Sequence, residues 1–189
     1  CGAGGNAVNF VSRIENIPFL KAMQKIGESV GIRVDVKVDK DSALKAKYYD
    51  ILSQSAQFYQ FYLQNTEHGK QAKTYLQSRN LTEDILEQFE IGLSPKGNDL
   101  LYQALLKTNV VPLDMIELGL VKHDREYYDV FRNRIIFPIC DLQGNKVGFS
   151  GRIYDGSQSS HKYVNSPETI IFKKSQILYN YHQAANEIK

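Results

Sequence analysis

Two apolar stretches decide the fold of the carboxyl-terminal half of this chain: Arg134-Ile-Ile-Phe-Pro-Ile-Cys140 and Lys146-Val-Gly-Phe-Ser-Gly-Arg152. Both contain β-branched and aromatic residues, and the segment between them, Asp141-Leu-Gln-Gly-Asn145, has the composition of a turn. The pattern predicts a β-hairpin. Arg134 and Arg152 lie at the ends remote from the turn, so we expect both at the open end of the hairpin, where their side chains could converge on one path of phosphates.

The stretch after the hairpin, Lys162-Tyr-Val-Asn-Ser-Pro-Glu-Thr169, is polar, and Pro167 biases the residue before it away from helix. Residues 130–174 hold seven basic and three acidic side chains, whereas residues 81–129 hold four basic and ten acidic ones. A basic, β-rich surface with tyrosine and asparagine suits a polyanion groove. The competing interpretation, a solvated strand face, is the one that composition alone favours.

The chain upstream of the hairpin is predicted to be mostly helical, because its apolar residues recur at helical spacing. Asn80 can end a helix in the left-handed conformation, and the aromatic residues of the long helix are expected in the core. The expected helices cover residues 19–30, 43–65, 69–79, 82–89, 100–106 and 113–118, with a last one from about Lys174; residues 32–38 and 91–93 are expected to be extended. The sequence therefore predicts an α+β fold, mainly helical in its first half and then a small β-hairpin or sheet region.

Composition bounds the class of protein. The chain has 189 residues, 42% hydrophobic side chains and a formal net charge of +2, as in a folded globular protein. The charged segment 39–42 is a predicted linker between residues 1–38 and 43–189. No apolar run approaches the length needed to cross a bilayer, so we expect no membrane partner. Two distant cysteines, Cys1 and Cys140, do not suggest a disulfide framework, and we expect a cytoplasmic protein.

Familiar catalytic motifs are missing from the sequence. It has no GxxxxGK[ST] phosphate loop, no HExxH, no GxSxG and no pair of Cys-x-x-Cys motifs. The four histidines lack ligand spacing and are expected at the surface: His68, His123, His161 and His182. The residues alone leave three classes open, namely part of an enzyme, a non-catalytic module that binds single-stranded nucleic acid, and a helical scaffold.

Several segments together resemble the bacterial replicative DNA primases. They follow the order of that family along the whole chain: Cys1-Gly-Ala-Gly-Gly-Asn6, Tyr75–Leu81, Phe89–Gly92, Arg132–Ile139, Gly148–Arg152, Lys162–Thr169 and Phe172–Lys174. Asn80, Ser150 and Lys173 stand where the family usually has glycine, glycine and histidine.

The resemblance implies a fragment of a DNA-directed RNA polymerase, a nucleotidyltransferase that makes short RNA primers on single-stranded DNA for DNA replication. Residues 1–38 would be the end of a zinc-binding domain, and residues 43–189 the amino-terminal subdomain of the catalytic core. Cys1 would be the last of four zinc ligands, so zinc is not expected to bind here. Magnesium would sit at a toprim site beyond Lys189. We therefore expect no catalytic residue in this chain and no activity from it alone.

The resemblance also implies which side chains contact nucleic acid or nucleotide. These are basic or polar residues of the hairpin and its flanks: Arg79, Arg132, Arg134, Arg152, Lys162, Tyr163, Asn165 and Lys174. The implied partners are single-stranded DNA template, RNA–DNA hybrid and nucleoside triphosphates. The replicative helicase would bind a carboxyl-terminal domain that this chain lacks, and we expect a monomer.

Overall fold

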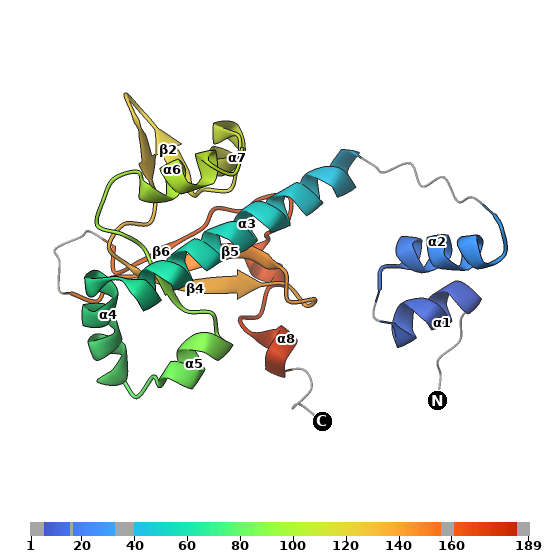
Figure 1. Cartoon of the computed structure of the whole chain (residues 1–189), viewed down its shortest axis with the longest axis horizontal. Helices are drawn as coiled ribbons and strands as arrows, with labels where there is room; N and C mark the ends of the chain where they lie inside the picture. Colours follow the sequence, from blue (N-terminus) through green and yellow to red (C-terminus); the bar gives the residue numbers. More distant parts are fainter. Residues whose placement is uncertain (1–5, 16, 33–39, 156–160, 185–189) are drawn as a thin grey trace. The chain divides into compact units, whose positions relative to one another are not determined.

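The computed structural model describes residues 6–15, 17–32, 40–155 and 161–184 (Figure 1). The chain forms two compact units, Cys1–Ala43 and Leu44–Lys189. In the first unit, helices α1 (Ala7–Ile14) and α2 (Phe19–Ser29) pack together. The sequence analysis missed α1, which begins after Asn6, whose side chain accepts a hydrogen bond from the Asn9 amide. Residues 33–38, expected to be extended, lie outside the described residues.

The second unit begins with a long helix, followed by shorter ones. Helix α3 covers Lys40–Asn65, so residues 40–42, for which a linker was expected, form its first turn. The helices that follow are α4 (Glu67–Gln77), α5 (Glu83–Gln88), α6 (Leu100–Leu106) and α7 (Pro112–Glu117). As expected, Asn80 is left-handed, with φ 61°. The predicted start of the last helix near Lys174 was wrong, since residues 174–176 form a 3₁₀ turn and α8 (Tyr181–Ala184) begins later.

A four-stranded antiparallel sheet forms the centre of the second unit. Its strands are β1 (Gly92–Leu93), β4 (Ile135–Cys140), β5 (Lys146–Arg152) and β6 (Tyr163–Asn165), in the order β1-β4-β5-β6. The predicted hairpin is confirmed as β4 and β5, and the polar stretch after it supplies β6. A separate hairpin of β2 (Val121–His123) and β3 (Tyr127–Asp129) was not anticipated.

One face of the sheet packs against α3, which runs across it (Figure 1). Phe149 of β5 is fully buried, and its ring meets the Tyr59 ring of α3 edge-on, with centroids 5.5 Å apart. Contact is so close at the sheet edge that a Cβ on Gly92 would lie 2.5 Å from the Tyr59 Cβ, and only glycine fits there. Tyr48 and Tyr59 are therefore core residues, as the sequence predicted.

Within the described residues, no helix is both long and apolar enough to span a membrane.

Candidate nucleic-acid interface

Strand register places four polar side chains on one face of the sheet. Arg152 pairs with Tyr163, and Ser150 pairs with Asn165. Directly opposed residues of antiparallel strands project to the same face, and so do alternate residues of one strand. Phe149 projects to the opposite face, into the core beneath α3. We call Ser150, Arg152, Tyr163 and Asn165 the polar face of the sheet.

At one end of the polar face, arginines and tyrosines alternate in space. The Arg152 guanidinium carbon lies 5.8 Å from the centroid of the Tyr163 ring and 5.9 Å from that of Tyr75. The Arg79 guanidinium carbon lies 5.5 Å from the Tyr75 centroid. Contacts of this kind hold a guanidinium group without neutralising its charge. These four residues, the cation–aromatic row, present two positive charges and an exposed ring at the surface.

Arg152 is only partly satisfied within the row. Its Nε atom is buried and has no hydrogen-bond partner among the described residues. Tyr163 is 51% exposed, so it is a surface side chain and not a core one. A planar ring exposed beside guanidinium groups is what stacking on a base and binding of the adjacent phosphate require.

Further along the same face lies an open hollow of about 200 Å³. Asn165 and Ser150 of the polar face line it, together with Lys174 and four apolar or aromatic side chains: Ile139, Phe172, Ile177 and Tyr179. The backbone amide of Lys174 is fixed by a hydrogen bond to Glu168 Oε1 at 3.1 Å. The structure thus brings Asn165 and Lys174 together, at a place where an amide and an ammonium group border an apolar surface.

Arg134 and Arg152 do lie at the open end of the hairpin, but their side chains do not converge. Ile135 is the residue that pairs with Arg152. Arg134 precedes Ile135 by one position and therefore projects to the opposite face, the one that packs beneath α3. It is 7% exposed, and its guanidinium donates to the carbonyl oxygens of Gly151 (3.3 Å), Lys162 (3.3 Å) and His161 (3.0 Å). Burial lowers its pKa from the ordinary value. Arg134 therefore ties β5 to the segment entering β6.

The remaining candidates lie apart from the row or outside the described residues. Arg132 is exposed near the β2–β3 hairpin, with its guanidinium carbon 5.4 Å from the centroid of the Tyr128 ring and a 3.3 Å hydrogen bond to Asn98 Oδ1. The Lys162 side chain is exposed next to Tyr163. Cys1 lies outside the described residues.

Sequence reasoning named Tyr75 only as part of a motif and gave it no role, although it is the ring that both arginines share. Helical spacing was the available signal, since residues four apart on a helix are neighbours and Arg79 follows Tyr75 by four.

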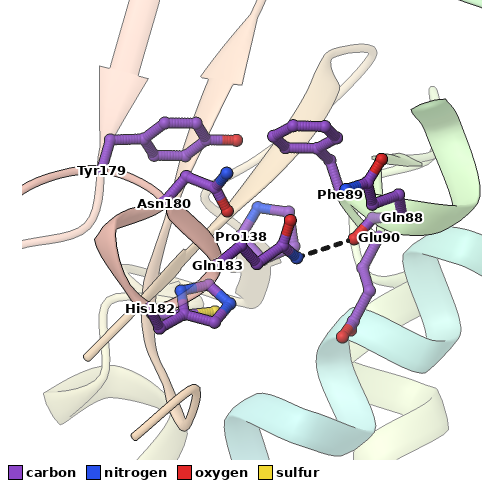
Figure 2. A pocket seen from close by; sticks show the side chains of 9 residues that line it. Gln88, Phe89, Glu90, Pro138, Tyr179, Asn180, His182 and Gln183 are labelled. Carbon is purple, nitrogen blue, oxygen red and sulfur yellow. Dashed lines mark hydrogen bonds between the residues drawn. The ribbon is translucent and has the colours of Figure 1, made fainter. Parts of the chain in front are cut away.

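A second, small hollow lies where α8 packs against β4 and the end of α5 (Figure 2). It measures about 20 Å³, room for about one water molecule. Gln183 Nε2 donates to the Gln88 carbonyl at 2.9 Å, and Pro138 and Cys140 of β4 form one wall. Burial raises the pKa of the Cys140 thiol. The small volume and this hydrogen bond indicate a contact between packed elements, and not a ligand site.

Within the described residues, no group of three or more histidine, cysteine, aspartate or glutamate side chains could hold a metal ion. The zinc and magnesium that the resemblance implies stay a prediction, because Cys1, the implied zinc ligand, lies outside those residues. Basic and aromatic groups carry the chemistry of this surface, and it is suited to binding a polyanion.

The fold is an α+β domain whose sheet carries arginine and tyrosine side chains on one face. The family model described as "DNA primase catalytic core, N-terminal domain" matches residues 58–185. The chain belongs to this family.

Relatives and solved structures agree with this assignment. The DNA primase of Geobacillus stearothermophilus is 38% identical over 203 residues, covering 100% of this chain and 33% of that protein. A DnaG primase catalytic domain bound to ssDNA matches with a TM-score of 0.69 and 31% identity, over 78% of this chain and 45% of the other. The zinc-binding and RNA polymerase domains of the Aquifex aeolicus primase match with a TM-score of 0.68 and 29% identity. That match covers 100% of this chain and 45% of the other. The chain thus spans about a third of the length of the primase relatives.

Proposed function

We propose that this chain is part of a DNA primase, a DNA-directed RNA polymerase that makes short RNA primers on single-stranded DNA for replication, and that the polar face of the sheet lines the path of the nucleic acid. The observation that carries the proposal is the cation–aromatic row, continuous with Ser150 and Asn165 on one face. A related catalytic domain described as bound to ssDNA supports it.

Each side chain has a distinct task in this proposal. Arg79 and Arg152 bind phosphate oxygens, and Tyr163 stacks on a base. Asn165 donates a hydrogen bond to a sugar or phosphate oxygen, while Lys162 and Lys174 add positive charge. Contacts of this kind hold template, RNA–DNA hybrid or incoming nucleotide in line for a reaction whose catalytic groups lie elsewhere. Arg134 acts indirectly, by fixing the backbone before Tyr163.

Zinc, magnesium and helicase binding belong to the proposed whole protein. Magnesium would supply charge stabilisation for nucleotidyl transfer, and zinc would be structural. We place these functions in the two thirds of the relatives that this chain does not match, except that Cys1 would be a zinc ligand. The chain itself is proposed to be a cytoplasmic monomer without primer synthesis of its own.

Binding of a labelled single-stranded oligonucleotide across a salt series tests the interface. On single strands each phosphate contact gives a log–log slope of about −0.7, so the Arg79→Ala/Arg152→Ala double variant should flatten the slope by roughly 1.4 and weaken binding. Arg125→Ala is the matched control, because Arg125 is exposed but flanked by Asp124 and Glu126. If the wild type does not bind, or if the double variant keeps the wild-type slope, the proposed interface is refuted.

The alternative function, a non-catalytic module for single-stranded nucleic acid, predicts the same salt dependence. Template-dependent RNA synthesis separates the two. The full-length protein with magnesium should synthesise RNA primers on single-stranded DNA, and the Arg79→Ala/Arg152→Ala variant should lose most of that activity. A folded full-length protein that binds DNA but makes no RNA would favour the module.

A further inference from the structure

A partly buried polar network lies beside the cation–aromatic row, with His68 at its centre. His68 is in the first turn of α4, whereas Tyr75 and Arg79 lie toward the other end of that helix and just beyond it. The His68 Nε2 atom lies 2.9 Å from Asn133 Oδ1 and 2.6 Å from the Tyr154 hydroxyl. The sequence analysis expected His68 at the surface, which was wrong: the side chain is half-buried and its Nδ1 atom is fully buried.

The orientation of Asn133 decides which imidazole nitrogen carries the proton. Asn133 Nδ2 donates to Asp155 Oδ2 at 2.6 Å, so its Oδ1 faces His68 as an acceptor. His68 Nε2 must then be the protonated nitrogen, and Asn133 Oδ1 and the Tyr154 oxygen share its hydrogen. Nδ1 carries the lone pair and has no hydrogen-bond partner among the described residues.

Burial and Lys96 lower the pKa of His68, while Asn133 and Asp155 oppose that shift. The Tyr62 ring packs edge-on against the imidazole, with centroids 5.8 Å apart. His68 is therefore held as a neutral donor.

The network reaches the row through a contact between two tyrosine rings. The Tyr154 ring centroid lies 5.7 Å from that of Tyr75, and Tyr154 follows Arg152 by two residues at the end of β5. His68 thus connects the start of α4 to the turn before β4 and to the chain leaving β5. Arg79 follows the end of α4 and Arg152 is the last residue of β5, so the network links the two elements that carry the arginines.

We propose that His68 is a positioning residue for nucleic-acid binding: its Nε2 proton holds Tyr154 and Asn133, and through them keeps Tyr75 between the two arginines. This inference rests on the proposed function, because it concerns the same interface. His68 itself does not touch the nucleic acid. Its loss should leave the number of phosphate contacts unchanged and make each binding event less favourable.

The salt series distinguishes positioning from contact. His68→Phe keeps a ring but removes the donor, and we expect roughly threefold to tenfold weaker binding of a single-stranded oligonucleotide, the effect of about one net hydrogen bond. The log–log line should run parallel to that of the wild type, whereas Arg152→Ala should flatten it. His68→Gln supplies an amide donor at a similar reach and should restore binding to within about twofold.

His123→Phe is the matched control, because His123 also contacts a tyrosine, Tyr127, with centroids 4.3 Å apart, but lies on β2. It should bind as the wild type does. Tyr154→Phe removes only the hydroxyl that contacts His68 and should also weaken binding. This second variant tests the inference if His68→Phe does not fold.

A third readout is the nitrogen chemical shift of the His68 imidazole at neutral pH, which should report the Nε2-protonated neutral tautomer. Unchanged affinity in both His68→Phe and Tyr154→Phe, a flattened salt slope, or an Nδ1-protonated ring would overturn the inference. Because all of these outcomes are read against a wild type that binds, they differ from failure of the proposed function, in which the wild type does not bind.

Discussion

The two faces of the β5–β6 pair serve different purposes, although on the Arg152 side the neighbouring β4 residues Ile135 and Phe137 also pack into a hydrophobic cluster. On one face Phe149 is completely buried beneath α3, and on the other its neighbours Ser150 and Arg152 border Asn165 and Tyr163. Alternation along a single strand therefore separates residues that stabilise the fold from residues available to a ligand. Substitutions of adjacent residues should consequently give different phenotypes, loss of stability on one face and loss of binding on the other.

The largest expected effect comes from the buried face. Phe149→Ala should lower the free energy of unfolding by about 3–5 kcal/mol, because it removes a fully buried ring and leaves a cavity. Urea denaturation measures the change. Ser150→Ala is the control on the other face and should cost less than about 1 kcal/mol. A small loss for Phe149→Ala would mean that the two faces are not distinct in this way.

Next in size is the effect of Arg134, whose side chain was expected to converge with that of Arg152 and instead lies buried. Arg134→Met leaves the carbonyl oxygens of Gly151, Lys162 and His161 without this donor, and should cost about 3 kcal/mol in urea denaturation. Unchanged stability together with a flattened salt slope for DNA binding would instead make Arg134 a phosphate ligand.

This pair of arginines illustrates what the sequence could and could not predict. The two apolar runs and the turn between them predicted the hairpin, so the shared position of Arg134 and Arg152 at its open end was correct. The face to which each arginine projects depends on which residue of β4 pairs with Arg152, and a shift by one residue reverses it. The residues of the turn did not specify that pairing.

The short β2–β3 hairpin was missed because strands of three residues carry too little periodicity to be recognised. The contact of Tyr75 with Arg152 and the hydrogen bonds of His68 could not be predicted, because these partners come from distant segments, β5 and the chain after it and the turn before β4.

A smaller effect is expected from the exposed ring of the polar face. Tyr163→Ala should weaken binding of a single-stranded oligonucleotide by about 1–3 kcal/mol, roughly fivefold to a hundredfold, because it removes a stacking surface. Stability should change little, since the side chain is half exposed. Tyr128→Ala is the matched control, because Tyr128 also has an arginine over its ring. Equal effects of the two substitutions would contradict the assignment of the binding face.

The last prediction concerns a gradual change of stability with pH, caused by Asp129, a carboxylate buried in the second unit. Burial raises its pKa to about 6, although the backbone amides of Leu101 and Tyr102 donate to it. The folded protein therefore binds the proton more tightly than the unfolded chain between about pH 4 and pH 6. The Asp129 contribution to stability should fall as pH rises through that window, by at most about 1.4 kcal/mol per pH unit.

Asp129→Asn should lack this component, and the difference between the urea denaturation curves of the wild type and the variant at several pH values isolates it. Parallel pH profiles would show that Asp129 is ionised in the folded protein throughout.

The most direct test of the account is a site-specific photocrosslink to single-stranded DNA. Tyr163→benzoylphenylalanine places a photoreactive ring on the polar face, Tyr128→benzoylphenylalanine places one beside Arg132, and Arg152→Ala in the first background removes the adjacent charge. We predict efficient crosslinking from position 163, strong reduction by Arg152→Ala, and little crosslinking from position 128. Crosslinking from position 128 with none from position 163 would contradict the assignment of the polar face as the nucleic-acid interface.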